Sequence, residues 1–153
     1  MIVTRDSIRV GVPPMLAYEH LVRFIEFPRY LSGVLSLTPL DSKTARLVLD
    51  IGGRRVEFDA VVTEAEPGRF VRWRARDHSE VVESFWLEAV ADEQTDVVCV
   101  TEVDNSQLSL FGEVPEVTLR SRLRTDLKGF KRFCEESAAR AAEGEAADEP
   151  ESR

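Results

Sequence analysis

The side chain best placed for chemistry in this sequence is Glu83, which alternates with apolar residues along a strand-like run. Residues two apart share one face of a strand, so Glu83 lies on the same face as Val81 and Phe85. Desolvation among apolar side chains raises the pKa of a carboxyl group, which can then act as a general acid or base in proton transfer or dehydration. A structural interpretation competes with this one. The cost of burying an unpaired charge favours a Glu83 that pairs across the sheet with Arg72 or Arg74.

Tyr30 is the second candidate for acid–base chemistry. It lies just before the turn into the strand-like run 34–40, where its hydroxyl could bind or protonate a ligand carbonyl. A tyrosine in such a place more often packs its ring in the core and presents its hydroxyl to water. Glu83 and Tyr30 are therefore the catalytic residues we expect if this protein is an enzyme.

Both residues require a sheet and a helix to position them. Apolar alternation, interrupted by turn signals such as Gly52-Gly53 and Pro67-Gly68, predicts short strands joined as an antiparallel meander. The predicted strands are 8–12, 34–40, 45–51, 54–66, 70–76, 81–89 and 96–103. Periods of three and four residues predict a helix at 14–25 and a long amphipathic helix from about 117 to about 142.

The last helix carries one apolar stripe, while its basic side chains fall largely on the other sides. The stripe consists of Leu119, Leu123, Leu127, Phe130 and Cys134. Asp126 is expected to form a surface ion pair with Arg122 or Arg124. The order of elements predicts an α+β fold in which a curved, seven-stranded antiparallel sheet wraps around this helix and leaves an apolar cavity between them.

Side chains that face this cavity are predicted to bind a hydrophobic or aromatic small molecule, although aromatic residues at these periods also commonly fill a core. From the strands and the helix we expect Phe58, Val71, Trp73, Phe85, Cys99, Thr101, Leu123, Leu127 and Phe130. Segment 104–115 is long for a loop and contains Leu108, Leu110 and Phe111. Long loops with apolar tips are often lids or binding loops, so Leu110 and Phe111 join the predicted site. Binding of a protein partner by residues 108–111 is the alternative.

Composition excludes several classes of function. The net charge is −8, and the seven acidic residues from Glu135 onward, against two arginines, account for −5 of it. No basic surface for nucleic acid is expected, and no apolar run approaches the ~20 residues of a membrane helix. The N-terminus does not resemble a signal peptide, which predicts a cytoplasmic protein. We expect one domain at 1–142, a disordered acidic tail at 143–153, and neither a cofactor nor a metal site.

Several short motifs are similar to landmarks of a known family. They are Phe27-Pro28-Arg29-Tyr30, Ile51-Gly52-Gly53-Arg54, Arg69-Phe70-Val71-Arg72-Trp73, and Asp126-Leu127 with Phe130-Lys131. The chain, from about residue 3 to residue 136, thus resembles the polyketide cyclase/dehydrase and lipid-transport branch of the START-like superfamily, the helix-grip fold. The resemblance implies a cavity for lipids, quinones or aromatic polyketides.

The same resemblance implies two activities, because some members cyclise or dehydrate polyketides and many only bind. Enzymatic aromatase/cyclases place an arginine and a tyrosine in the pocket to polarise polyketide carbonyls. Here the central inner positions Phe58, Ala60 and Val62 contain no arginine, and Arg54 and Arg55 lie at a hairpin. This departure favours binding as the first hypothesis, with a cyclase or dehydratase as the alternative.

Overall fold

A computed structural model describes residues 1–76, 81–106 and 108–148. One seven-stranded antiparallel sheet has the order β1-β7-β6-β5-β4-β3-β2. The elements are β1 Ile2–Val10, α1 Pro14–Val22, η1 Phe24–Arg29, β2 Val34–Pro39, β3 Thr44–Ile51, β4 Arg54–Glu66, β5 Phe70–Ala75, β6 Val81–Ala91, β7 Gln94–Val103 and α2 Glu116–Asp148. The predicted α+β fold class is confirmed.

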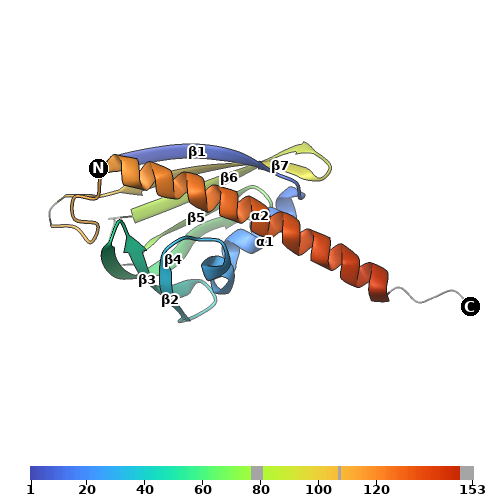
Figure 1. Ribbon diagram of the computed structural model, residues 1–153, viewed down its shortest axis with the longest axis horizontal. Helices are drawn as coiled ribbons and strands as arrows, with labels where there is room; N and C mark the ends of the chain where they lie inside the picture. Colours follow the sequence, from blue (N-terminus) through green and yellow to red (C-terminus); the bar gives the residue numbers. More distant parts are fainter. Residues whose placement is uncertain (77–80, 107, 149–153) are drawn as a thin grey trace, which may run out of the picture.

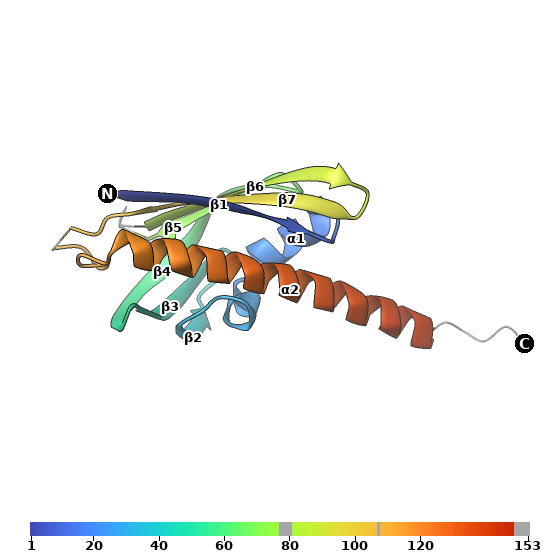
Figure 2. The same ribbon diagram turned by 45° about the horizontal axis from the view of Figure 1, so that its top comes forward.

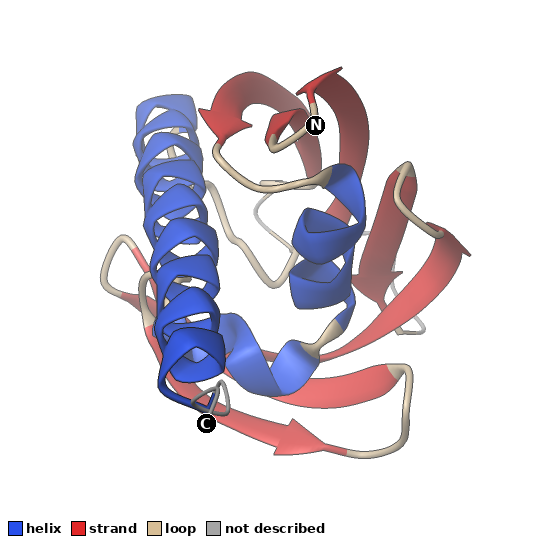
Figure 3. Cartoon of the chain, turned by 90° about the vertical axis from the view of Figure 1, so that its right-hand side faces the viewer, coloured by secondary structure: helices blue, strands red, loops and turns tan. Residues whose placement is uncertain are grey.

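The sheet curves around α2, which crosses its inner face from one end to the other (Figure 1). Figure 3 shows α1 and η1 on the same inner side, so that helices and strands surround a common interior. Each strand turns alternate residues inward. Trp73 on β5, Phe85 on β6 and Cys99 on β7 are buried in one cluster with the apolar stripe of α2, which includes Cys134.

Two glycines permit close geometry that other residues would not. Gly52, with a φ of 59°, sits in the two-residue turn that joins β3 to β4, where Ile51 pairs with Arg54. Gly129 lies on the face of α2 turned to the end of η1, and a β-carbon there would come within 2.5 Å of the Tyr30 carbonyl oxygen. The backbone of α2 can therefore approach the chain at Tyr30 closely.

Some predicted boundaries differ from the structure. β1 begins at Ile2 instead of residue 8, because it pairs with β7 along its whole length, from Ile2 opposite Val103. The first helix ends at Val22 instead of residue 25, and a 3-10 helix containing Pro28 follows it. A proline inside an α-helix would remove a hydrogen bond and clash with the preceding turn.

The C-terminal helix is longer than predicted. α2 ends at Asp148 instead of about residue 142, so residues 143–148, assigned from the sequence to the disordered tail, are helical. This stretch is rich in alanine and glutamate, which have high helix propensity. Figure 2 shows the C-terminal end of α2 projecting beyond the sheet. Residues 77–80, between two of the predicted strands, and residues 149–153 of the predicted tail lie outside the described residues.

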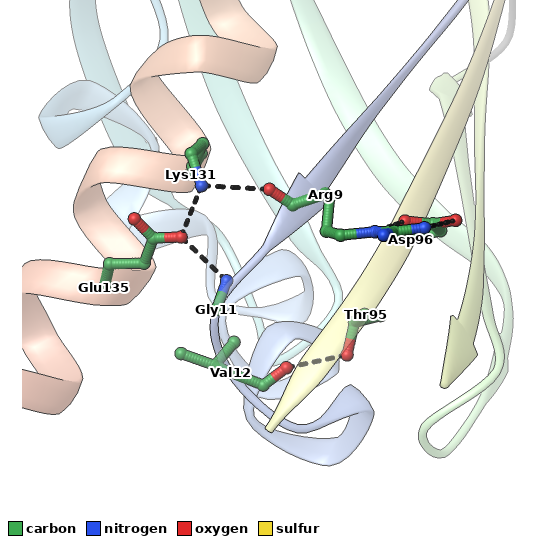
Figure 4. A network of polar contacts seen from close by, with 7 residues as sticks. All are labelled: Arg9, Gly11, Val12, Thr95, Asp96, Lys131 and Glu135. Carbon is green, nitrogen blue, oxygen red and sulfur yellow. Dashed lines mark hydrogen bonds and ion pairs between the residues drawn. The ribbon is translucent and has the colours of Figure 1, made fainter. Parts of the chain in front are cut away.

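Polar contacts fasten α2 to the edge strand β1. The ammonium group of Lys131 donates to the Arg9 carbonyl oxygen at 3.0 Å and pairs with Glu135 at 2.6 Å. Glu135 also accepts a hydrogen bond from the Gly11 amide at 2.7 Å (Figure 4). We call these four residues the β1 seam. Beside it, the Arg9 side chain pairs with Asp96 of β7 at 2.8 Å.

Candidate ligand-binding site

A cavity of about 70 Å³ lies between α2 and the inner face of the sheet. Fifteen of the residues that line it are apolar: Leu21, Leu31, Leu47, Leu49, Ile51, Phe58, Trp73, Val81, Phe85, Val103, Phe111, Leu119, Leu123, Leu127 and Phe130. Five polar residues complete the lining: Tyr30, Glu83, Thr101, Arg122 and Asp126. One water molecule needs about 10–15 Å³ on such a scale, so the cavity holds a few waters at most.

Most of the predicted site residues reach this cavity. Both predicted catalytic residues line it, as do eight predicted ligand-binding residues: Phe58, Trp73, Phe85, Thr101, Phe111, Leu123, Leu127 and Phe130. Three predicted residues do not. Val71 and Cys99 are completely buried behind the wall, and Leu110 lies outside it, where its carbonyl oxygen accepts a hydrogen bond from the Arg54 side chain.

Glu83 points into the cavity and does not form the ion pair that the structural interpretation required. Its Oε2 accepts a hydrogen bond from the Thr101 hydroxyl at 3.2 Å. Arg72 instead pairs with Glu64 at 2.9 Å and donates to the Ser84 hydroxyl at 2.9 Å. The expectation that Glu83 pairs with Arg72 or Arg74 is therefore wrong, because the alternation of β6 places Glu83 on the inner face.

The pKa of Glu83 is raised to about 7. Burial is the largest cause, since it disfavours the charged form, and the nearby charge of Asp126 raises the pKa further. The Thr101 hydrogen bond, the positive charge of Arg122 and the Trp73 side chain oppose this shift. Glu83 retains some accessible surface, which we assign to the cavity because protein encloses the rest of the side chain. At neutral pH both protonation states are populated.

Arg122 and Asp126 are the polar residues that sequence reasoning misplaced. Their ion pair, 3.5 Å long, is part of the cavity wall, and the two side chains are only 18% and 14% exposed. Arg122 also donates to the Asp50 carbonyl oxygen at 3.2 Å. Asp126 accepts hydrogen bonds from the amide and the hydroxyl of Ser32, both at 2.8 Å. The expected surface ion pair is thus largely buried, and the cavity does contain an arginine, supplied by α2.

The environment of Asp126 resembles that of Glu83. Burial raises the pKa of Asp126, and this effect exceeds the lowering by Arg122 and by the two hydrogen bonds from Ser32. Two carboxyl groups with raised pKa values therefore line one cavity. Such a combination is more common at functional sites than elsewhere.

Tyr30 is buried in an aromatic cluster at one side of the cavity. Its ring centroid lies 5.2 Å from that of Phe130 and 5.7 Å from that of Phe27. The hydroxyl donates to the His20 carbonyl oxygen at 3.5 Å. Burial raises the pKa of Tyr30 well above its usual value, and the charges of Cys134 and Glu83 add to the effect. In this arrangement the ring of Tyr30 forms part of the cavity wall, and its hydroxyl is a weaker acid than that of an exposed tyrosine.

The loop before α2 places Phe111 inside the protein. Phe111 is 2% exposed and its ring centroid lies 6.1 Å from that of Phe58 across the cavity. Leu108, in contrast, is 98% exposed. Phe111 is therefore not accessible to a protein partner and lends no support to the partner-binding alternative, whereas a covering role for the loop agrees with its position.

A surface groove of about 470 Å³ adjoins the cavity between α2 and the turn that joins β3 to β4. Ile51 and Arg122 line both spaces. Arg122, held by Asp50 and Asp126, thus stands between the cavity and the solvent-filled groove. Ile51 and Arg122 are therefore the side chains shared by the two spaces.

Several wall residues were not predicted, although signals for them exist. Leu47, Leu49 and Ile51 alternate on β3 as Trp73 and Phe85 do on their strands. Arg122 and Asp126 flank the stripe of α2, three residues after Leu119 and Leu123 respectively, where a helical face can turn either inward or outward.

Residues 1–135 match the profile of a family described as polyketide cyclase / dehydrase and lipid transport. The chain belongs to this family. An uncharacterised 17.2 kDa protein from Streptomyces lincolnensis is 29% identical to it over 134 residues, which are 86% of this chain and 88% of that protein. Membership in this family agrees with a cavity lined mainly by apolar residues.

Solved structures agree in fold. A START superfamily protein from Mycobacterium smegmatis has a TM-score of 0.72 at 14% identity, covering 88% of this chain and 97% of that one. The Zhui aromatase/cyclase from Streptomyces sp. R1128 has a TM-score of 0.66 at 15% identity, covering 88% and 93%. At these identities the likeness shows the START-like fold.

Other types of site are not evident in the part of the chain that the structure describes. No group of three or more histidine, cysteine, aspartate or glutamate side chains there is arranged to hold a metal ion. None of the described helices has the length and apolar character that crossing a membrane requires.

Proposed function

We propose that this protein binds a hydrophobic or aromatic small molecule in the cavity between α2 and the sheet. The observation that carries the proposal is the composition of the cavity wall, in which fifteen apolar residues surround a small set of polar ones. Ligand sites typically combine an apolar lining with a few polar groups that fix orientation. Membership in the polyketide cyclase / dehydrase and lipid transport family supports this assignment.

The size of the cavity limits how a ligand enters. Pockets for drug-sized ligands measure about 300–1,000 Å³, whereas this cavity measures about 70 Å³. A lipid or polyketide therefore requires side chains to separate, and the adjoining groove of about 470 Å³ offers space. We propose that the ligand enters past Arg122, with its apolar part in the cavity and the remainder in the groove.

Native mass spectrometry of protein purified gently from its own host tests this function. We expect a bound species of defined mass. Leu123→Phe, which adds volume at the cavity wall, should reduce the bound fraction, while Leu35→Phe on the exposed face of β2 should not. Protein that is empty, and that binds no hydrophobic probe in solution, would contradict the proposal.

Catalysis of polyketide cyclisation or dehydration is the second candidate. Glu83, with a pKa of about 7 inside the cavity, could transfer protons near neutral pH. Arg122 supplies the pocket arginine whose apparent absence argued against an enzyme, and Tyr30 lies in the same wall. If this function is correct, Glu83→Gln removes turnover of a bound polyketide and leaves its affinity within a few-fold. Loss of affinity without any wild-type turnover would leave binding as the function.

A further inference from the structure

The polar residues of the cavity differ in how the protein satisfies them. The Tyr30 hydroxyl donates to the His20 carbonyl, and the Thr101 hydroxyl donates to Glu83. Arg122 and Asp126 pair with each other, and each has a further partner on β3 or the loop before β2. Glu83 alone among the charged groups of the cavity lacks a partner of opposite charge within ion-pair distance among the described residues. The positive charge of Arg122 acts on Glu83 only from beyond that distance, so Glu83 is the charge without a direct ion partner.

Glu83 also has capacity for further hydrogen bonds. An ionised carboxylate offers about four acceptor positions, and the Thr101 hydroxyl and the Trp73 side chain occupy two of them. Because Glu83 lines the cavity, a group placed there can reach it without any change in the sheet. Buried charges in proteins are normally paired, so a ligand that brings a positive charge would complete this site.

The surrounding wall suits an organic cation. The rings of Phe58, Trp73 and Phe85 line the same cavity, and Phe58 and Trp73 are stacked with centroids 6.2 Å apart. Aromatic faces attract cations, most strongly where water is excluded. An anionic ligand would find the opposite conditions, because Glu83 and Asp126 repel it and Arg122 is already paired.

We propose that the cavity takes a hydrophobic amine, whose ammonium group pairs with Glu83 while its apolar part lies against the aromatic wall. This inference rests on the proposed binding function and names the chemical class of the ligand. A neutral ligand with a hydroxyl or carbonyl oxygen is the competing possibility, since that oxygen would accept a hydrogen bond from protonated Glu83.

Three probes of similar size separate these possibilities: 2-phenylethylamine, 2-phenylethanol and phenylacetate. We expect calorimetry at pH 8 to give the amine at least a tenfold lower Kd than the alcohol, with phenylacetate weakest. In Glu83→Gln, which keeps the shape of the side chain, the preference for the amine over the alcohol should fall below threefold. Glu64→Gln, the same change on an exposed side chain paired with Arg72, should leave the preference intact.

The pH dependence gives a second readout. An ammonium ligand requires ionised Glu83, so its affinity should rise about tenfold from pH 6 to pH 8, as expected for a group with a pKa near 7. A neutral ligand that accepts a hydrogen bond from protonated Glu83 would instead lose affinity as the pH rises from 6 to 8. The other titratable or charged groups that face Glu83 are Tyr30 after η1, Cys99 on β7, and Arg122 and Asp126 on α2. Asp126→Asn therefore serves to detect any part of the pH dependence that comes from Asp126.

The outcomes distinguish this proposal from the function on which it rests. If the alcohol binds as tightly as the amine, or if the amine preference survives in Glu83→Gln, the amine proposal is wrong while binding in the cavity stands. If none of the three probes binds and gently purified protein carries no ligand, both proposals fail. Correct folding of Glu83→Gln is established from its circular dichroism spectrum and unfolding transition.

Discussion

Two sets of polar side chains lie between α2 and the sheet. They differ in whether burial or hydrogen bonding has the larger effect on the pKa values of their carboxyl groups. In the β1 seam, burial raises the pKa of Glu135, but hydrogen bonds from Lys131 and Gly11 outweigh it and the pKa is lowered overall. In the cavity, burial outweighs the partners, and the pKa values of Glu83 and Asp126 are raised. The charged form of a carboxyl side chain is thus favoured in the β1 seam and disfavoured in the cavity.

The difference distinguishes a carboxylate that stabilises the fold from carboxyl groups whose ionisation costs free energy. A carboxylate with an ammonium group and a backbone amide beside it helps to hold two elements together. The β1 seam joins α2 to β1 in this way. A carboxyl group whose charged form is unfavourable contributes little to stability and costs free energy when ionised. Under the proposed function such a group meets a ligand or a proton, and this proposal yields predictions about both sets.

The largest effect is expected from Glu83→Gln. The pKa of Glu83 is raised from 4.5 to about 7 in the folded state, so wild-type stability is greatest below pH 4.5 with respect to this group and is lost as pH rises toward 7. At about 1.4 kcal/mol per pKa unit, the loss amounts to about 3 kcal/mol. Urea unfolding at pH 5 and pH 8 should show Glu83→Gln relatively more stable at pH 8. Parallel pH profiles for the two proteins would refute the raised pKa.

Asp126→Asn is expected to have the next largest effect. Arg122 loses its ion partner, but the raised pKa of Asp126 means that ionising this carboxyl already costs free energy in the folded protein. The two effects oppose each other, so we expect the free energy of unfolding to fall by about 1 kcal/mol at most. The pKa of Glu83 should fall, because the charge of Asp126 contributes to raising it. A ¹³C NMR titration of the Glu83 carboxyl measures this directly. Asp59→Asn, at an ion pair with Arg46 on the sheet, is the matched control and should leave that pKa unchanged.

Glu135→Gln tests the other set. The lowered pKa of Glu135 means that its stabilising contribution is present above its usual pKa near 4.5 and is lost as pH falls through the folded value. Because the seam is partly solvated, we expect a loss of only about 0.5 kcal/mol at pH 7, reduced further by salt. Ligand affinity should not change. An effect on ligand affinity would show that the β1 seam and the cavity are coupled.

Arg9→Gln is expected to have the smallest effect. Arg9 and Asp96 form a good ion pair at 2.8 Å, but the Arg9 side chain is 59% exposed to water and that of Asp96 is 34% exposed. Exposed ion pairs commonly contribute little, because water solvates the separated charges nearly as well. The melting temperature should be unchanged within error. A clear decrease would mean that the pair supports the β1–β7 edge more than its exposure indicates.

Period-two reasoning succeeded where one face of the sheet is uniformly buried. It placed Trp73, Phe85, Glu83 and Thr101 on the inner face, because the alternation of each strand is unambiguous. It could not decide whether Glu83 had an ion partner. That depends on which face Arg72 occupies and on its competing partners Glu64 and Ser84, which are set by the register of three strands.

Helical periodicity was less informative at the margins of the stripe. Leu123, Leu127 and Phe130 were correctly placed, but Arg122 and Asp126 lie at the edge of the face, where the direction of a side chain depends on what packs beside it. The partner of Asp126 is Ser32, 94 positions away in the chain. The size of the cavity could not be predicted either, because it depends on how side chains of several elements interlock.

The two cysteines allow the opening of the interface between α2 and the sheet to be measured. Cys99 on β7 and Cys134 on α2 are both 0% exposed, on opposite sides of the interface between sheet and helix. Burial raises the pKa of Cys99 well above its usual value and that of Cys134 to about 12, so neither thiol reacts readily in the closed state. The rate at which a thiol reagent modifies them therefore reports how often α2 lifts from the sheet, and a ligand that fills the interior should slow that rate.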